Sequence, residues 1–151
     1  MPRVIISDTS CLILLHKIEE LELLEKLYKQ VLTTPEVARE FGLELPEWII
    51  IESVKDRKYL EFLETQVDNG EASAIALAKE KDSPLVILDD LKGRKLARKL
   101  DLKVTGTLGI IQKARQEGLI KKIRPLIEKL LIHEFWIGEN IVEELLRKNN
   151  E

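Results

Sequence analysis

The sequence predicts an α/β protein in which helices cover both faces of a central, mainly parallel sheet, giving three layers (α/β/α). Short apolar runs alternate with longer amphipathic segments along the chain, a pattern typical of strand–helix–strand units. The 151 residues correspond to one domain of ordinary size. No repeat, low-complexity tract or linker-like segment divides them, so we expect a single domain over residues 1–151.

Five apolar runs predict the strands. They lie at residues 4–6, 31–33, 48–51, 85–88 and 103–105. The run at 85–88 is apolar throughout, as expected for a central strand that is buried on both faces.

Nine segments predict helices, and turn residues mark several of their ends. Pro35 suits the first turn of a helix capped by Thr34, and Gly118 follows the end of another. The predicted helices span residues 9–16, 20–28, 35–41, 55–64, 71–81, 91–100, 107–117, 123–133 and 139–148.

Charge and cysteine content narrow the class of protein. The formal net charge is −3, whereas proteins that bind nucleic acid by overall charge are usually basic. Binding to nucleic acid would therefore need a local basic patch, or metal ions in an acidic site. Cys11 is the single cysteine, and the N-terminal apolar run is too short for a signal peptide or a membrane span. We expect a soluble cytoplasmic protein that does not bind membranes.

Carboxylates follow two of the predicted strands. Asp8 comes just after the first strand, and Asp89 and Asp90 follow the fourth. Glu71 lies in the first turn of the helix before the fourth strand, and Glu40 lies near the end of the helix after the second. Ligands of open parallel sheets bind at the carboxyl ends of the strands, so these acids are expected to converge on one cleft.

Each acid also has a purely structural interpretation. Asp8 and Asp89 can cap the helices that follow them, with Asp90 in a first turn. Glu71 suits the positive end of a helix dipole, and an exposed helical glutamate such as Glu40 is ordinary.

A cluster of carboxylates predicts a divalent cation. Carboxylates gathered in one cleft repel one another unless they take up protons or bind a cation, and Mg²⁺ and Mn²⁺ prefer oxygen ligands. The sequence has no Cys-x-x-Cys pair, and His16 and His133 are isolated, which argues against zinc. Ions bound there would polarise a phosphodiester and activate water.

Four segments, in order, resemble the motifs of PIN domains. They are Ile-Ile-Ser-Asp-Thr-Ser at 5–10, Pro-Glu-Val-Ala-Arg-Glu at 35–40, Gly-Glu-Ala-Ser-Ala-Ile-Ala-Leu-Ala at 70–78, and Leu-Asp-Asp at 88–90 followed by Ala97. Their order and spacing match as well, and the resemblance covers nearly the whole chain. Asp-Asp-Leu-Lys-Gly-Arg at 89–94 and Val-Thr-Gly-Thr-Leu-Gly at 104–109 are similar to a narrower PIN-related group. The resemblance implies an endoribonuclease that depends on Mg²⁺ or Mn²⁺.

The resemblance also implies particular residues. It makes Asp8, Glu40, Glu71 and Asp90 the catalytic acids. Metal ligands would come from Asp8, Glu71 and Asp90, with Asp89 replacing or assisting Asp90.

Hydroxyl and basic groups lie near these acids. The hydroxyls of Thr9 and Ser10 can join the water shell of the metal, on the substrate side. Arg94 belongs to a basic helix and can hold a substrate phosphate, although a solvated helical face is the alternative. Thr107 can approach a phosphate, or it can simply cap its helix. Trp48 can stack on a base or pack in the core.

The resemblance extends to partners. The best-known PIN-domain members are VapC-type toxins, which act on RNA and are held inactive by a small antitoxin protein. Family habit implies a homodimer, and Leu21, Leu24 and Leu27 suit either a dimer face or the core.

Two other functions compete with the nuclease. One is a PIN-like binding module that has lost catalysis, which incomplete convergence of Glu40 and Glu71 would favour. The other is a receiver-type phosphoacceptor, whose acidic pair should follow the first strand. Here the pair follows a later strand, so this function ranks last.

Overall fold

The computed structural model describes residues 4–133, 135 and 137–151, and all the predicted helices and strands are found there. Trp136, a second candidate for base stacking, lies outside the described residues. The strands are β1 (Val4–Ser7), β2 (Val31–Thr33), β3 (Ile49–Ile51), β4 (Pro84–Ile87) and β5 (Lys103–Thr105). The helices are α1 (Thr9–Lys17), α2 (Glu22–Tyr28), α3 (Pro35–Phe41), α4 (Arg57–Leu63), α5 (Asn69–Lys79), α6 (Leu91–Lys99), α7 (Thr107–Gln116), α8 (Arg124–Ile132) and α9 (Glu139–Lys148).

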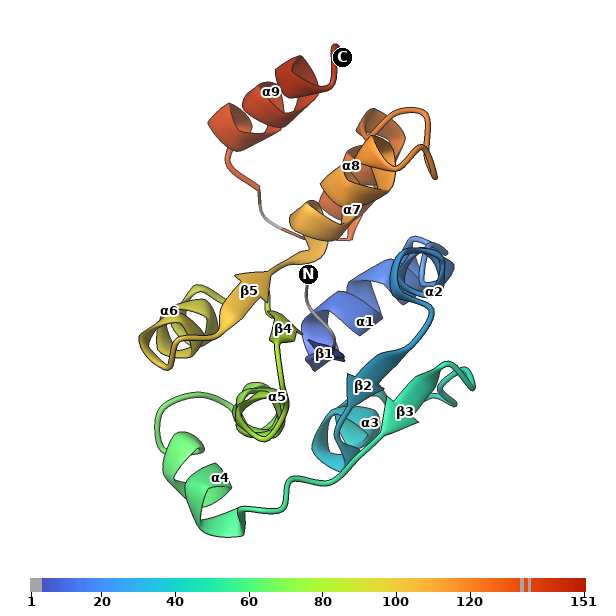
Figure 1. Ribbon diagram of the computed structural model, residues 1–151. Coiled ribbons are helices and arrows are strands. Elements are labelled where there is room, and N and C mark those ends of the chain that lie inside the picture. The colour runs from blue at the N-terminus through green and yellow to red at the C-terminus, as the bar shows by residue number, and fades with distance from the viewer. Residues whose placement is uncertain (1–3, 134, 136) are drawn as a thin grey trace.

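The five strands form one parallel sheet in the order β3-β2-β1-β4-β5 (Figure 1). Ile6 of β1 is level with Leu32 of β2 on one side and with Val86 of β4 on the other. The chain turns back between β1 and β4, so these two neighbouring strands are far apart in sequence. That is the position at which open parallel sheets bind their ligands.

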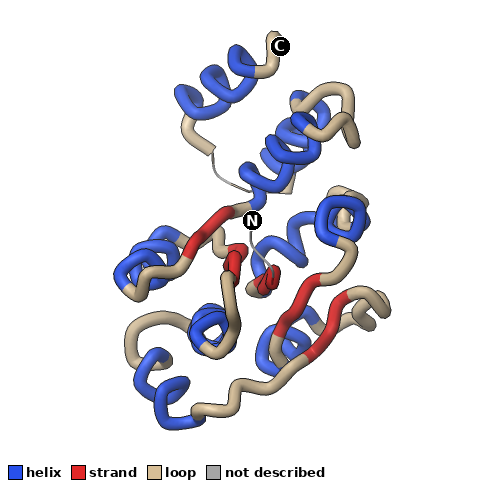
Figure 2. The backbone as a smooth tube through the Cα atoms, viewed as in Figure 1, coloured by secondary structure: helices blue, strands red, loops and turns tan. Residues whose placement is uncertain are grey.

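Helices cover both faces of the sheet, which confirms the three-layer prediction (Figures 1 and 2). Successive strand residues point to opposite faces, so Ile5 and Ile87 pack with α1, α2, α7 and α8, whereas Ile6 and Val86 pack with α4, α5 and α6. Helix α3 contacts both α1 and α5. The continuous apolar runs in β1 and β4 therefore reflect burial on both faces.

Several predicted ends were wrong by one or two residues. Trp48 precedes β3 instead of belonging to it. Helix α5 begins at Asn69, two residues before its predicted start at Glu71. The cause is local capping, since the Asp68 side chain accepts from the Glu71 amide and starts the helix earlier. Helix α3 matches its prediction, with the Thr34 hydroxyl accepting from the Val37 amide and Gly42 in the left-handed conformation after its end.

Among the described residues, no helix is long and apolar enough to cross a membrane.

Candidate metal centre

Asp8 is a buried carboxylate at the carboxyl end of β1. The residue is 1% exposed, and its backbone N–H donates to the Ile87 carbonyl oxygen at 3.1 Å. It occupies the N-cap position of α1, yet its side chain makes no capping hydrogen bond, and among the described residues Oδ1 has no partner. Capping therefore does not account for Oδ1.

The electrostatic surroundings of Asp8 disfavour its charged form. Burial raises the pKa of Asp8 well above its ordinary value, and the neighbouring charge of Asp89 adds to the rise. The charges of Asp68 and Glu40 act in the same direction, and the backbone amide of Cys11 opposes them. A positive ion at this point would reverse the balance.

Glu71 is a second buried carboxylate, in the first turn of α5. It is 6% exposed, and its Oε2 atom is buried without a hydrogen-bond partner among the described residues. Burial and the adjacent Asp68 raise the pKa of Glu71 to about 9, with further contributions from Asp90 and Asp8. The carboxyl group consequently holds a proton at neutral pH when no cation is bound.

A glycine makes room for the Glu71 carboxylate. A Cβ atom at Gly93 of α6 would collide with Glu71 Oε2. The backbone of α6 can approach the carboxylate closely because Gly93 lacks a side chain. This explains the glycine in the Asp-Asp-Leu-Lys-Gly-Arg segment.

Glu40 reaches the same region from the last turn of α3. Its carboxylate lies against Gly70, where a Cβ atom would collide with Glu40 Oε1 and would lie 2.8 Å from the Thr9 hydroxyl oxygen. Partial burial and the charge of Asp68 raise the pKa of Glu40, while the Thr9 hydroxyl and the Gly70 amide oppose the rise. The first and third motifs therefore meet the second around Gly70.

Asp89 is tied to the beginning of α7. The Thr107 amide donates to Asp89 Oδ1 at 2.7 Å, and the Thr107 hydroxyl donates to Oδ2 at 2.6 Å. Burial still leaves the pKa of Asp89 raised, although Thr107 and the Arg94 guanidinium lower it. The sequence predicted that Asp89 could cap α6 and that Thr107 could cap α7, and both predictions were wrong. Asp89 accepts hydrogen bonds from α7, and Thr107 follows Gly106, which is the N-cap residue of α7.

Arg94 is half-buried beside Asp89. Its Nη1 atom donates to the Leu88 carbonyl oxygen at 2.9 Å, and a Cβ atom at Gly106 would lie 2.6 Å from Nη1. One side of the guanidinium is thus used to hold the chain between β4 and α6. Arg94 lies next to the acids, as the sequence predicted, with part of its hydrogen-bonding capacity committed to the fold.

Asp90 and Ser10 are exposed, as Glu40 is. Asp90 is the N-cap residue of α6, and its Oδ2 atom accepts from the Gly93 amide at 3.2 Å. Asp90 is close enough to Glu71 for its charge to raise the Glu71 pKa. Ser10 lies one residue beyond Thr9 in the first turn of α1.

The acids thus gather at one edge of the sheet, where they affect one another's charge. The pKa of Asp8 is raised by the charges of Asp89, Asp68 and Glu40. The pKa of Glu71 is raised by Asp68, Asp90 and Asp8. Among the described residues, however, no three His, Cys, Asp or Glu side chains form a group that could hold a metal ion.

The residues nevertheless fit a hard divalent cation. Asp8 Oδ1 and Glu71 Oε2 are buried oxygen atoms without partners among the described residues, and oxygen is the ligand that Mg²⁺ and Mn²⁺ prefer. Mg²⁺ usually keeps several waters and binds only one or two carboxylates. A site of this kind does not require three protein ligands already in place.

Two acidic residues of this region were missed by the sequence. Asp68 influences the pKa of Asp8, Glu40 and Glu71. Glu36 is 9% exposed and forms an ion pair with Arg57 at 3.2 Å. The position of Asp68 just before a predicted helix could have identified it from the sequence. The burial of Glu36 could not be foreseen, because its partner Arg57 is 21 residues away.

A cavity of about 450 Å³ opens beside this edge, between α3 and the segment that leads into α5. Glu36, Arg39, Glu40, Asp68 and Asn69 are among its lining residues. Glu40 and Asp68 can therefore be reached from solvent on the side of α3.

This fold and this acidic sheet edge define a class of α/β protein in which carboxylates from several strands and helices meet. The chain belongs to the PIN-domain family, because the family model DUF3368, described as a PIN domain, matches residues 4–151. PIN domains are generally metal-dependent nucleases. No curated protein and no solved structure matches the chain.

Proposed function

We propose that the protein is a divalent-metal-dependent endoribonuclease that hydrolyses RNA phosphodiesters at the carboxyl edge of the sheet. The observation that carries the proposal is the pair of buried carboxyl oxygens, Asp8 Oδ1 and Glu71 Oε2, that have no partner among the described residues. Leaving such groups unpaired costs about 1–3 kcal/mol each. Sites of function are where such a cost is commonly found.

Asp8 and Glu71 would hold Mg²⁺ or Mn²⁺, with Asp90 as a further ligand. A bound ion of this kind polarises the phosphodiester and lowers the pKa of a bound water. Glu40, which is exposed and has a raised pKa, is suited to accept the proton of the attacking water. These four acids form the catalytic set of the proposal.

Asp89 has a different part in this proposal. Both of its oxygens accept hydrogen bonds from Thr107, whereas Asp90 uses Oδ2 to cap α6. We therefore assign the principal ligand role to Asp90, and Asp89 contributes negative charge next to Asp8.

Substrate contacts would come from the groups around the acids. Thr9 and Ser10 lie on the first turn of α1, where their hydroxyls can join the water shell of the ion. The remaining side of the Arg94 guanidinium can bind a phosphate, while Thr107 acts through the backbone turn that it fixes.

A labelled pool of single-stranded RNAs tests the proposal, with Mn²⁺, Mg²⁺ or EDTA added in turn. The Asp8→Asn variant should lose cleavage by at least about 100-fold, the usual scale for removing a positioned catalytic group. Asp82→Asn, at an exposed position, is the matched control and should cleave like the wild type. Cleavage that survives in Asp8→Asn or in EDTA would refute the mechanism.

A catalytically inactive binding module is the second candidate. The observation that favours it is the absence, among the described residues, of three groups that could already hold a metal ion. Fluorescence anisotropy with the same RNAs separates the two functions. Tight RNA binding with no metal-dependent cleavage would favour the binding module over the nuclease.

Partners and location belong to the same proposal. Membership of the family suggests a small antitoxin protein, a homodimer and a cytoplasmic location, with residues 1–151 acting as one domain. Leu24 is fully buried, so a dimer face over α2 would involve Leu21 and Leu27, which are half-buried. Sedimentation velocity that detects only monomer at micromolar concentration would refute the homodimer.

A further inference from the structure

A cavity of about 620 Å³ lies at the amino ends of the strands, opposite to the end of the sheet where the acids gather. Trp48, one of its lining residues, immediately precedes β3, and its carbonyl oxygen accepts from the amide of Val31, the first residue of β2. The cavity is therefore at the amino ends of these strands, whereas Asp8 and Asp90 follow the carboxyl ends of β1 and β4. A ligand bound there would be separate from the proposed metal centre.

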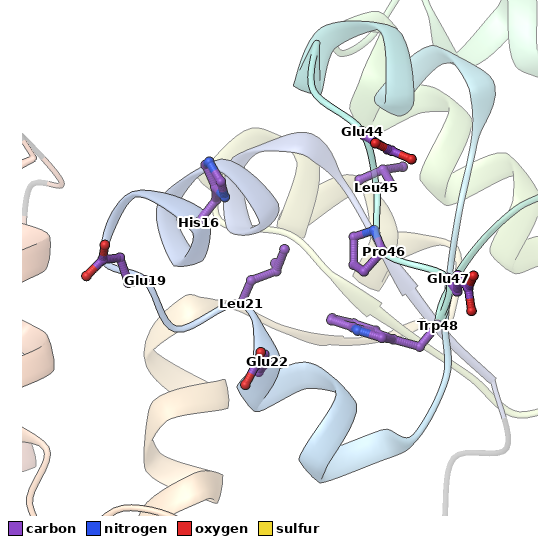
Figure 3. A pocket seen from close by; sticks show the side chains of 9 residues that line it. All are labelled: His16, Glu19, Leu21, Glu22, Glu44, Leu45, Pro46, Glu47 and Trp48. Carbon is purple, nitrogen blue, oxygen red and sulfur yellow. The ribbon is translucent and has the colours of Figure 1, made fainter.

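The middle of this cavity is apolar. Leu21, Leu45, Pro46 and Trp48 line it, and each is half-buried. In Figure 3 the Trp48 ring extends towards Leu21, with Pro46 beside the ring. The Ile49 amide donates to the Pro46 carbonyl oxygen at 3.0 Å, so the backbone that carries the indole is held in place before any ligand arrives.

The rim of the cavity is acidic. Glu19, Glu22, Glu44 and Glu47 line it together with His16, and all five are exposed. Figure 3 shows Glu22 and Glu44 on opposite sides of an apolar strip formed by Leu21, Leu45, Pro46 and Trp48. Within the described residues, no lysine or arginine lines the cavity, and none of the four glutamates forms an ion pair.

We propose that this cavity binds a linear aliphatic polyamine. Carboxylates on either side of an apolar strip match ammonium groups joined by methylene chains. The methylenes would pack on Leu21, Pro46 and the indole of Trp48, and an ammonium group over the indole would gain a cation–π contact. The volume lies within the range of small-molecule sites, about 300–1,000 Å³.

Other ligands fit this surface less well. An anion would be repelled by the four glutamates, and a neutral apolar ligand would form no charged contact with them. A metal ion would gain nothing from the Trp48 and Leu21 side chains. A lysine side chain of a partner protein shares the alkylammonium chemistry but brings one ammonium group, whereas Glu22 and Glu44 offer carboxylates on opposite sides of the apolar residues (Figure 3).

Spermidine is the probe for the test, added to the full-length protein without RNA. Calorimetry gives the affinity, and tryptophan fluorescence reports on the indole. Glu22→Gln combined with Glu44→Gln removes two rim charges. Glu61→Gln combined with Glu128→Gln is the matched control, because these two glutamates are exposed and lie outside the cavity. Circular dichroism checks that every variant is folded.

We expect the rim variant to bind spermidine at least about tenfold more weakly, in line with the loss of charge-assisted contacts. The control variant should bind within about twofold of the wild type, and Trp48→Phe should abolish the fluorescence response. The proposal is overturned if both double variants lose affinity equally, or if no binding is measured. It is also overturned if a blocked single-lysine peptide binds as tightly as spermidine, or if Mg²⁺ at equal ionic strength produces the same change in Trp48 fluorescence.

Discussion

Thr107 donates two hydrogen bonds to Asp89, one from its backbone amide at 2.7 Å and one from its hydroxyl at 2.6 Å. These two bonds join Asp89, two residues beyond the end of β4, to the first residue of α7, 18 positions later. Asp89, which the sequence predicted as a metal ligand, thereby holds the turn after β5 next to the other acids.

Replacing Thr107 with valine should destabilise the protein by about 2 kcal/mol. The change keeps the shape of the side chain and removes the hydroxyl, which leaves Asp89 Oδ2 without that donor in a partly buried position. Urea denaturation measures the difference. Thr65→Val is the control, since its hydroxyl bond to the Phe62 carbonyl oxygen is exposed, and an equal loss in both variants would contradict the assignment.

Replacing Gly93 with alanine should weaken Mn²⁺ binding by about tenfold or more, equivalent to about 1.4 kcal/mol. The added Cβ would collide with Glu71 Oε2, so the carboxylate must move. Alanine favours helices by about 1 kcal/mol over glycine, so loss of metal should not reflect a weaker helix. Titration calorimetry compares this variant with Lys95→Ala, an exposed change in α6; unchanged affinity in Gly93→Ala would refute the role of Glu71.

Stability without metal should fall as the pH rises, because of Glu71. Its pKa is about 9 in the folded protein against an ordinary 4.5, so the folded state binds more protons than the unfolded state between these values. The stability that the protonated form provides is complete below about pH 4.5 and is lost as the pH rises towards about 9.

Glu71→Gln tests this pH dependence, because glutamine resembles the protonated acid and does not titrate. In EDTA the variant should be more stable than the wild type at pH 8 by at least about 1 kcal/mol, and the gap should narrow at pH 5. Urea unfolding at both pH values gives the comparison, with exposed Glu61→Gln as control. A gap that does not change with pH would show that Glu71 is ionised in the folded protein.

The Cys11 thiol should be unreactive in the native protein. It is 0% exposed, and burial, together with the charge of Asp89, raises the pKa of the Cys11 thiol well above its ordinary value. A thiol reagent at pH 8 should modify the protein only after guanidinium unfolds it. Rapid modification under native conditions would mean that α1 opens readily.

The sequence was sufficient for the fold because the information is local. β1 and β4 are buried on both faces, so they read as continuous apolar runs, and residues such as Thr34, Pro35 and Gly42 mark the ends of α3. The acids after β1 and β4 followed from the same reasoning, since parallel strands bring their carboxyl ends together.

The rest could not be predicted because it depends on distant partners. Whether Asp89 or Asp90 caps α6 is decided by Thr107, which draws Asp89 to α7. The burial of Glu36 depends on Arg57. Likewise, the hydrogen bond between Thr34 and Ser73, at 2.6 Å, fixes α3 against α5 in a way that no spacing along the chain reveals.

The pairing of β1 with β4 also has a consequence in time. Asp8 emerges early from a ribosome, but β4, the strand that lies beside β1, is made much later, after β2, β3 and five helices. Until that strand inserts next to β1, Asp8 has neither Ile87 as a backbone partner nor Asp89 and Asp90 nearby. A growing chain therefore carries scattered acids, and the assembled cluster arises only when most of the protein has been synthesised.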